Sequence, residues 1–501
     1  MNPLRQLAGQ TAIYGLSSVV ARVLNYLLVP FYTRIFEPAE YGVVNELYAY
    51  VAFLMIILTY GMETAFFRFS SKSDNSPLVF STSIISLLIT STFFALVIIL
   101  FYPFIAQIIG YEGQKEFFLI LGLILAFDAL TAIPFARLRL QNKALRFMFI
   151  KIFNISANIG FNLIFLLLLP WLTNNGYSFF IVDLIYNPDF GVGYVFLSNF
   201  LASLFTLIFF LNDIRHIRFR FSAGILKNML AYSIPLLIAG FAGTVNEVID
   251  RILLRYRLPS DVNALEQIGI YGANVKIAVL MALFIQMFRY ASEPFFFSQE
   301  KNKNSLELYA TILHYFTIFG VFFFLVISLY IDLFKHIIDS AYFEGLRVVP
   351  IILLGNLMLG IYYNLSVWYK LKELTIFGAL FATIGALVTL AINWVFIPYY
   401  GYMASAWGHL ASYFTMVVLS WLIGMHYLKV PYKIKTILFY LLAGTGIFLL
   451  ASSLRIDSIY LRITVNTIFI VIFTIIVTYR ERKVIAVLLR SGNFRIFKKK
   501  E

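Results

Sequence analysis

The sequence predicts an all-α polytopic membrane protein. Of its 501 residues, 61% are hydrophobic and only 13% are charged, whereas soluble proteins carry about 25% charged residues. The mean hydropathy is +0.85, and apolar runs of roughly 20 residues, long enough to cross a bilayer, recur along the whole chain. Continuous apolar runs such as 164–169 lack the alternation of a membrane β-barrel, so we exclude that class.

The apolar runs define fourteen predicted membrane helices. The first contains Arg22 and has no small-residue cleavage site, so we interpret it as a retained helix and not as a signal peptide. The connections between helices are short, which places any function within the helices or at their mouths. The predicted spans are 10–31, 42–67, 79–101, 117–136, 147–170, 191–212, 229–254, 268–292, 308–331, 348–369, 374–398, 402–425, 436–453 and 463–479.

An internal repeat relates the two halves of the chain. A shift of 230 residues aligns Tyr41-Gly42 with Tyr271-Gly272 and sets Glu46 opposite Lys276, both polar in apolar helices. The second span therefore matches the eighth. Because the partners are six spans apart along the chain, an even number, the two repeats run parallel, about an axis along the membrane normal.

The repeat predicts two lobes and an appended pair of helices. We expect residues 1–222 to form an N-terminal lobe of six helices and residues 223–428 to form a second lobe of six. Residues 429–501 would add two helices and a basic cytoplasmic tail. Transporters built from parallel repeats rock two such lobes around a site at their interface.

The distribution of Lys and Arg predicts the orientation. With the N-terminus inside, 26 of the 39 lie in cytoplasmic segments, 8 on the opposite side and 5 within spans, so both termini are expected in the cytoplasm. The net charge of +14 then reflects topology and attraction of the tail to anionic lipids, and nucleic-acid binding is excluded because there is no basic soluble domain. The chain has no cysteine and only five scattered histidines, so we expect no metal and no cofactor.

Ten ionisable residues fall within the predicted spans, and these are the candidates for function. Each costs roughly 2.5–3.5 kcal/mol at the centre of a membrane helix, so such residues usually face a cavity or a partner. Basic residues in both lobes suit an anionic substrate, because guanidinium groups bind phosphate oxygens bidentately. The ten are Arg22, Glu46, Glu63, Asp128, Lys151, Glu247, Asp250, Arg251, Lys276 and Arg289.

Helical spacing groups several of these residues into polar stripes, which indicate a water-filled cleft shared by the lobes. The stripes are Ser18–Arg22–Asn25, Lys151–Asn154–Asn158–Asn162, Gly240–Gly243–Glu247–Asp250 and Gln286–Arg289–Glu293. The asparagine stripe could instead hydrogen-bond neighbouring helices, and both interpretations stay open. We expect substrate binding by Arg22, Asn25, Lys151, Asn154, Asn158, Lys276 and Arg289.

Gating or coupling is expected of the remaining candidates. Adjacent residues point roughly 100° apart on a helix, so we expect Asp250 and Arg251 to pair with neighbouring helices and not only with each other. Glu46, at a similar depth in the second span, is the expected partner of Arg251. The full gating set is Glu46, Asp128, Glu247, Asp250 and Arg251.

Several short segments resemble the bacterial polysaccharide (Wzx-type) flippases. The resemblance covers about residues 8 to 425. It is carried by Thr33–Gly42 (TRIFEPAEYG), Phe67-Arg68-Phe69, Asp250-Arg251 with Ile268–Gly272, and Asn393 with Pro398–Gly401.

The resemblance implies the fold of the multidrug/oligosaccharidyl-lipid/polysaccharide (MOP) exporters, a MATE-like arrangement in which two lobes surround a central cavity. Such flippases move a polyprenyl-pyrophosphate-linked oligosaccharide across the bacterial inner membrane by alternating access, for O-antigen, capsule or exopolysaccharide synthesis. The cationic cavity would hold the pyrophosphate and the glycan while the polyprenyl tail stays among membrane lipids. Polysaccharide polymerase machinery would be a further partner.

Three alternatives remain at this point. A lipid II flippase and a cation-coupled multidrug exporter share the fold, although a drug exporter would favour an acidic cavity. A membrane glycosyltransferase or polymerase would need a catalytic loop with clustered carboxylates, and the short outer loops argue against any enzyme. The chain has no G-x-x-x-x-G-K-[ST] motif, so transport would draw on an ion gradient, the membrane potential or consumption of the product.

Overall fold

The computed structural model is helical throughout and describes residues 19–72, 76–177, 182, 185–215, 220–300, 302, 304–454 and 456–482. Within these ranges, 13 helices are long and apolar enough to cross a membrane. They correspond to the second to fourteenth predicted spans, so the prediction of an all-α polytopic membrane protein is confirmed. The first predicted span lies partly outside the described residues; its described part is helical over residues 19–26 and continues in α2 (Leu28–Ile35).

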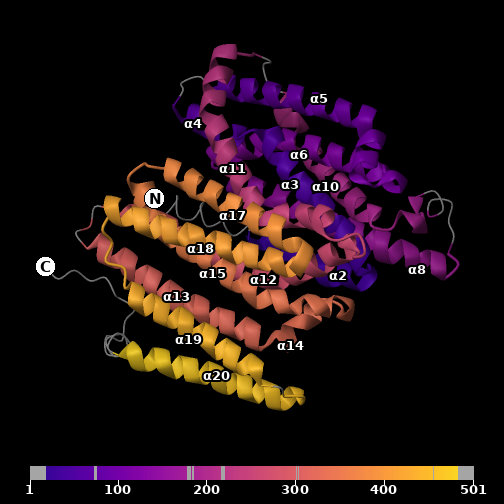
Figure 1. Ribbon diagram of the computed structural model, residues 1–501. Helices are drawn as coiled ribbons and strands as arrows, with labels where there is room; N and C mark the ends of the chain where they lie inside the picture. The colour runs from indigo at the N-terminus through magenta and orange to yellow at the C-terminus, as the bar shows by residue number, and fades with distance from the viewer. Residues whose placement is uncertain are drawn as a thin grey trace.

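The first half of the chain forms one group of helices, drawn in indigo to magenta in Figure 1. Helix α3 begins with Pro38 at its first turn and a capping box between Glu37 and Glu40, a common start for a helix. The helices are α3 (Pro38–Thr59), α4 (Met62–Lys72), α5 (Ser76–Ile109), α6 (Glu116–Leu140), α7 (Ala144–Leu163), α8 (Leu169–Asn174) and α10 (Gly193–Arg215).

The second half of the chain forms the other group, mostly orange to yellow in Figure 1. Helices α19 and α20 pack beside α13 at the edge of this group. The helices are α11 (Ala223–Arg257), α12 (Ala264–Gln299), α13 (Ser305–Leu329), α14 (Ile331–Phe334), η5 (Ser340–Val348), α15 (Val349–Leu365), α16 (Val367–Leu371), α17 (Ile376–Tyr400), α18 (Tyr402–Tyr427), α19 (Ile434–Ser453) and α20 (Ile459–Arg480).

Helices α3 and α12 cross in close contact between the two groups. A Cβ atom added to Gly42 would overlap the backbone carbonyl of Leu265, and one added to Gly269 would overlap that of Pro38. Glycine removes this obstacle and lets two membrane helices approach backbone to backbone. The crossing lies at the segments that the internal repeat aligns, so the two copies of the repeat meet here.

Helix α11 contacts both groups. Near its start, Met229 is buried with Met62 and Phe66 of α4. Farther along, the Asn246 amide donates to the Ala382 carbonyl of α17 (3.1 Å). Pro235 lies between these regions and removes one backbone hydrogen bond, which gives α11 a point at which it can bend.

Candidate functional site

A cavity of about 1020 Å³ lies between the two groups of helices. Its wall is formed by residues 22–32 and by α3, α7, α10, α11, α12, α15, α17 and α18. This volume is at the upper end of the usual range for small-molecule sites, about 300–1,000 Å³. The cavity can therefore hold a ligand larger than a single sugar.

The charged groups of the cavity wall are mostly basic. Arg22, Arg251, Lys276 and Arg289 line it, against one carboxylate, Glu247. A cleft lined by one sign of charge between low-dielectric walls concentrates ligands of the opposite sign. The other polar side chains of the wall are amides, hydroxyls and one imidazole, among them Asn25, Asn45, Asn154, Asn158, Asn199, Asn356, Gln286, Tyr290, Tyr363 and His409.

Six of the seven side chains expected to bind substrate line this cavity: Arg22, Asn25, Asn154, Asn158, Lys276 and Arg289. Lys151 does not line it in this conformation. Its ammonium group lies 4.3 Å from the centre of the Phe135 ring, inside the first group of helices, where Asp128 attracts it. The long side chain of lysine carries its charge away from the stripe on which its Cα lies.

The cations are spread along the cavity. Lys276 and Arg289 lie 13 residues apart on α12, which corresponds to roughly 20 Å along a helix. Gly269, at the α3–α12 crossing, is about two turns before Lys276. One end of the cavity thus lies near the crossing, and the other lies near Arg289 and the exposed Arg22.

The end near the crossing is closed by contacts between the two groups of helices. The Tyr342 hydroxyl donates to the Phe36 carbonyl (2.7 Å), and Arg34 Nη2 donates to the His336 carbonyl (2.9 Å). The Tyr342 ring also packs edge-on against Tyr41, with centroids 5.9 Å apart. We call this the closed end.

Asp250 and Arg251 pair with each other and, as expected, not only with each other, because both also contact Tyr271 of the neighbouring helix α12. Arg251 Nη1 lies 3.0 Å from Asp250 Oδ1 and donates to the Glu247 carbonyl (2.6 Å). The Tyr271 hydroxyl donates to the second Asp250 oxygen (2.6 Å) and fixes the carboxylate. The flexible arginine side chain folds back along its own helix to reach it. Of the gating candidates, Glu247 and Arg251 line the cavity, whereas Glu46, Asp128 and Asp250 do not.

The partner of Glu46 is Arg255, so the predicted Glu46–Arg251 pair is wrong in this conformation. Glu46 has no solvent exposure; it accepts a hydrogen bond from the Tyr111 hydroxyl (2.6 Å), and Arg255 Nε lies 3.8 Å away. Burial raises the pKa of Tyr111, which keeps that hydroxyl protonated as a donor. Beside this pair, the hydroxyls of Tyr50 and Tyr256 are 3.0 Å apart. We call this group the Glu46 clasp; its five residues are Glu46, Tyr50, Tyr111, Arg255 and Tyr256.

The clasp predicts energetic coupling between Glu46 and Arg255. A double-mutant cycle with Glu46→Gln and Arg255→Gln should give an interaction energy of about 0.5–3 kcal/mol, the usual range for contacting residues, measured from thermal unfolding in detergent. The same cycle with Arg251→Gln in place of Arg255→Gln serves as the control and should give a much smaller value. Strong coupling to Arg251 without coupling to Arg255 would contradict the clasp.

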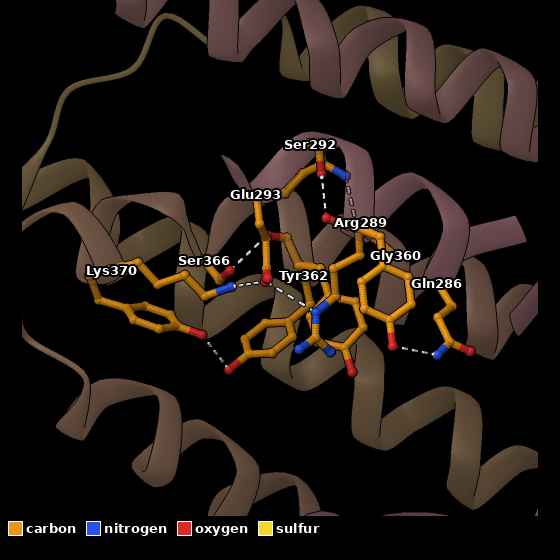
Figure 2. Close-up of polar contacts among 12 residues, drawn as sticks. Gln286, Arg289, Ser292, Glu293, Gly360, Tyr362, Ser366 and Lys370 are labelled. Atoms are coloured by element: carbon orange, nitrogen blue, oxygen red, sulfur yellow. Dashed lines mark hydrogen bonds and ion pairs between the residues drawn. The ribbon is translucent and has the colours of Figure 1, made fainter. Parts of the chain in front are cut away.

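At the other end of the cavity, Glu293 joins two cations (Figure 2). Glu293 Oε1 lies 3.1 Å from Arg289 Nε and 2.6 Å from Lys370 Nζ. The Arg289 guanidinium lies 4.8 Å from the centre of the Tyr363 ring, and the Gln286 amide donates to the Tyr290 hydroxyl (3.1 Å). The predicted polar stripe on α12 therefore faces this end.

Sequence reasoning missed several polar residues of the wall and one partner. Lys370, on α16, directly follows the predicted span 348–369 and so was not among the ten candidates, although it contacts Glu293. Asn45, Asn199 and Asn356 have no charged or amide residue three or four positions away, so no stripe marked them. His409 also lines the cavity, with Nε2 3.1 Å from Asn356 Oδ1.

A family model described as "Polysaccharide biosynthesis protein" matches residues 7–300, more than half of the chain. The chain belongs to this family. None of the curated proteins compared with the chain matches it.

Several solved structures share this fold. A structure titled "Lipid II flippase MurJ, inward closed conformation" is 16% identical and covers 94% of this chain and 99% of its own, with a TM-score of 0.69. An inward-facing multidrug resistance MATE family transporter of the MOP superfamily is 16% identical and covers 80% of this chain and 93% of its own, with a TM-score of 0.60. A MATE structure in complex with MaD3S is 14% identical and covers 85% of this chain and 98% of its own, with a TM-score of 0.59. This member of the polysaccharide biosynthesis protein family thus has the fold of MurJ and of the MATE transporters.

Proposed function

We propose that the protein flips a polyprenyl-pyrophosphate-linked oligosaccharide across the bacterial inner membrane, for synthesis of a cell-surface polysaccharide such as O-antigen, capsule or exopolysaccharide. The observation that carries this proposal is the cavity of about 1020 Å³, with four cations and one carboxylate in its wall. A diphosphate linkage is anionic and rich in acceptor oxygens, which suits guanidinium and ammonium groups.

Each class of side chain has a role in this proposal. Arg22 and Arg289 attract the diphosphate at one end, and Lys276 and Arg251 receive it deeper in the cavity. The amides of Asn154 and Asn158 bind sugar hydroxyls, and tyrosine rings pack against sugar faces. The polyprenyl tail remains among the membrane lipids.

Transport follows from relative motion of two lobes, residues 1–222 and 223–428, about the α3–α12 crossing. The contacts of the closed end and the Glu46 clasp separate when the outer mouth opens, and α11, which contacts both groups, bends near Pro235. Polysaccharide polymerase machinery would take up the product outside. Its consumption there, an ion gradient or the membrane potential would supply the free energy.

Two other substrates fit the fold but are less well supported. A cationic drug would be repelled by four basic residues facing one carboxylate. Lipid II shares the diphosphate chemistry, and at 16% identity the likeness to MurJ concerns the fold alone. The family match to polysaccharide biosynthesis favours the oligosaccharide.

The proposal is tested by the leaflet distribution of lipid-linked oligosaccharide in a strain that lacks the protein. Spheroplasts are treated with a membrane-impermeant enzyme that cleaves or modifies the glycan. The oligosaccharide should accumulate in protected form without the protein and become accessible on complementation, while lipid II accessibility stays unchanged. Normal accessibility of the oligosaccharide in the deletion strain would reject the proposal, and loss of lipid II accessibility would favour lipid II as the substrate.

The proposed orientation has a separate test. Both termini lie in the cytoplasm in this proposal, so the closed end faces outward. Cysteines introduced at the exposed positions Asn175 and Lys143 should react from opposite sides, because the helix formed by residues 144–174 separates them. Asn175→Cys should react with an impermeant maleimide in intact cells, and Lys143→Cys only after permeabilisation. Equal labelling of both in intact cells would contradict this orientation.

A further inference from the structure

The cation pair beside Glu293 forms an anion site that a residue of the protein already fills. Arg289 Nε and Lys370 Nζ both contact the same oxygen, Glu293 Oε1 (3.1 and 2.6 Å). The three side chains are 45%, 27% and 32% exposed, respectively, for Arg289, Lys370 and Glu293. An incoming anion can therefore reach the position that the carboxylate oxygen now occupies.

The side chains of Arg289, Glu293 and Lys370 lie between the central cavity and a small neighbouring pocket. Arg289 lines the central cavity, whereas Glu293 and Lys370 line a small adjoining pocket with Phe297 and Ser366. Figure 2 shows the Glu293 carboxylate between the two cations. The arginine thus has one face toward the central cavity and one nitrogen on the carboxylate.

The first lobe contains an ion pair at the position that the repeat aligns with Glu293. The 230-residue shift aligns Glu293 with Glu63, and Glu63 pairs with Arg139 at the end of α6. The same shift places Thr59 opposite Arg289. Neither Glu63 nor Arg139 lines the central cavity. The aligned ion pair of the first lobe therefore lies off the central cavity, whereas Arg289 of the second lobe lines it.

We propose that Glu293 is a built-in competitor, which holds the anion site of Arg289 and Lys370 until the diphosphate of an incoming lipid-linked substrate displaces it from Arg289. This inference rests on the proposed function and adds a residue that regulates substrate entry. After displacement, Glu293 keeps its contact with Lys370 while Arg289 binds the diphosphate.

The competitor sets the affinity of the entry site. Two nitrogens that share one oxygen are no more than roughly 6 Å apart, so they repel each other once the carboxylate is removed and attract an external anion more strongly. A carboxylate that rebinds Arg289 lowers the affinity for the diphosphate and lets it move on toward Lys276. Without Glu293, binding should be tighter and transport slower.

The test is pyrophosphate binding by the full-length protein in phosphatidylcholine nanodiscs, measured by calorimetry. Glu293→Gln should bind inorganic pyrophosphate about tenfold tighter than the parent, because a nearby negative charge is removed. Glu293→Ala should shift affinity in the same direction. Adding Lys370→Met to Glu293→Gln should reverse the gain. The matched control, Glu63→Gln, should leave pyrophosphate affinity unchanged, and Glu293→Gln should flip the lipid-linked oligosaccharide more slowly.

The outcomes separate this inference from the proposed function. Unchanged or weaker pyrophosphate binding by both Glu293 variants, with binding still dependent on Arg22, would overturn the inference and leave the function intact. Absence of pyrophosphate binding in the parent as well would count against both. A second arm replaces part of the phosphatidylcholine with phosphatidylglycerol. Loss of pyrophosphate binding there would assign the site to ordinary anionic headgroups and overturn its assignment to a diphosphate.

Discussion

Replacing Gly269 with alanine is expected to reduce transport more than tenfold, because it prevents the closed end from forming. The Cβ atom of alanine would overlap the Pro38 carbonyl oxygen, and the nearest obstacles are backbone atoms that cannot rotate away. Helix α12 must then move away from α3. If closure costs an additional 1.4 kcal/mol or more, the closed population falls at least about tenfold.

Accessibility of the cavity gives the readout for this variant. Asn45 lines the cavity on α3, and we expect Asn45→Cys to react with an impermeant reagent from outside faster in the Gly269→Ala protein than in the parent. Gly446→Ala is the matched control, because a Cβ atom there meets nothing within 4 Å. Wild-type transport together with a protected Asn45→Cys in the Gly269→Ala protein would show that the crossing does not control closure.

The membrane helices could be predicted from sequence because their signal is local. An apolar run of sufficient length must cross the bilayer whatever its neighbours do. The cavity residues were also largely predictable, since an ionisable side chain in such a helix must find water or a partner. Arg22, Lys276 and Arg289 follow this rule, and each lines the cavity.

The pairing of charges could not be predicted, because it depends on differences of one helical turn. Arg251 and Arg255 lie four residues apart and share a face of α11, so helical phase cannot tell which of them meets Glu46. An error of one turn in estimated depth exchanges the two partners. The position of Lys151 away from the cavity wall has a related reason. Its Cα lies on the asparagine stripe, but its ammonium group reaches the Phe135 ring.

The contact between Lys370 and Glu293 was hidden by a different ambiguity. A basic residue at the end of a membrane helix is already explained by the positive-inside rule. The sequence therefore gives no reason to expect that Lys370 also contacts Glu293. Only tertiary structure brings α16 beside α12. The same applies to α11, whose contacts with both groups of helices depend on long-range packing and leave no periodic signal in the sequence.

The other large effect is expected from Arg22→Ala. Within the part of the chain that the structure describes, the side chain of Arg22 has no ion-pair partner, it is exposed, and it lines the cavity. A guanidinium group in this position has its hydrogen-bonding fork available for an anionic ligand. Under the proposed function, that ligand is the diphosphate of the substrate.

Arg22→Ala should therefore abolish detectable surface glycan while leaving the amount of protein in the membrane near normal. A hydrogen bond to a charged group contributes about 1.5–3 kcal/mol, so its loss predicts a roughly 10–150-fold slower flip of lipid-linked oligosaccharide. Arg22→Lys should restore only part of the rate, because an ammonium group keeps the charge and loses the bidentate geometry. Arg480→Ala, at the end of α20 and outside the cavity wall, is the control and should transport normally. Full transport by Arg22→Ala would remove Arg22 from the site, and full rescue by lysine would leave charge alone as its contribution.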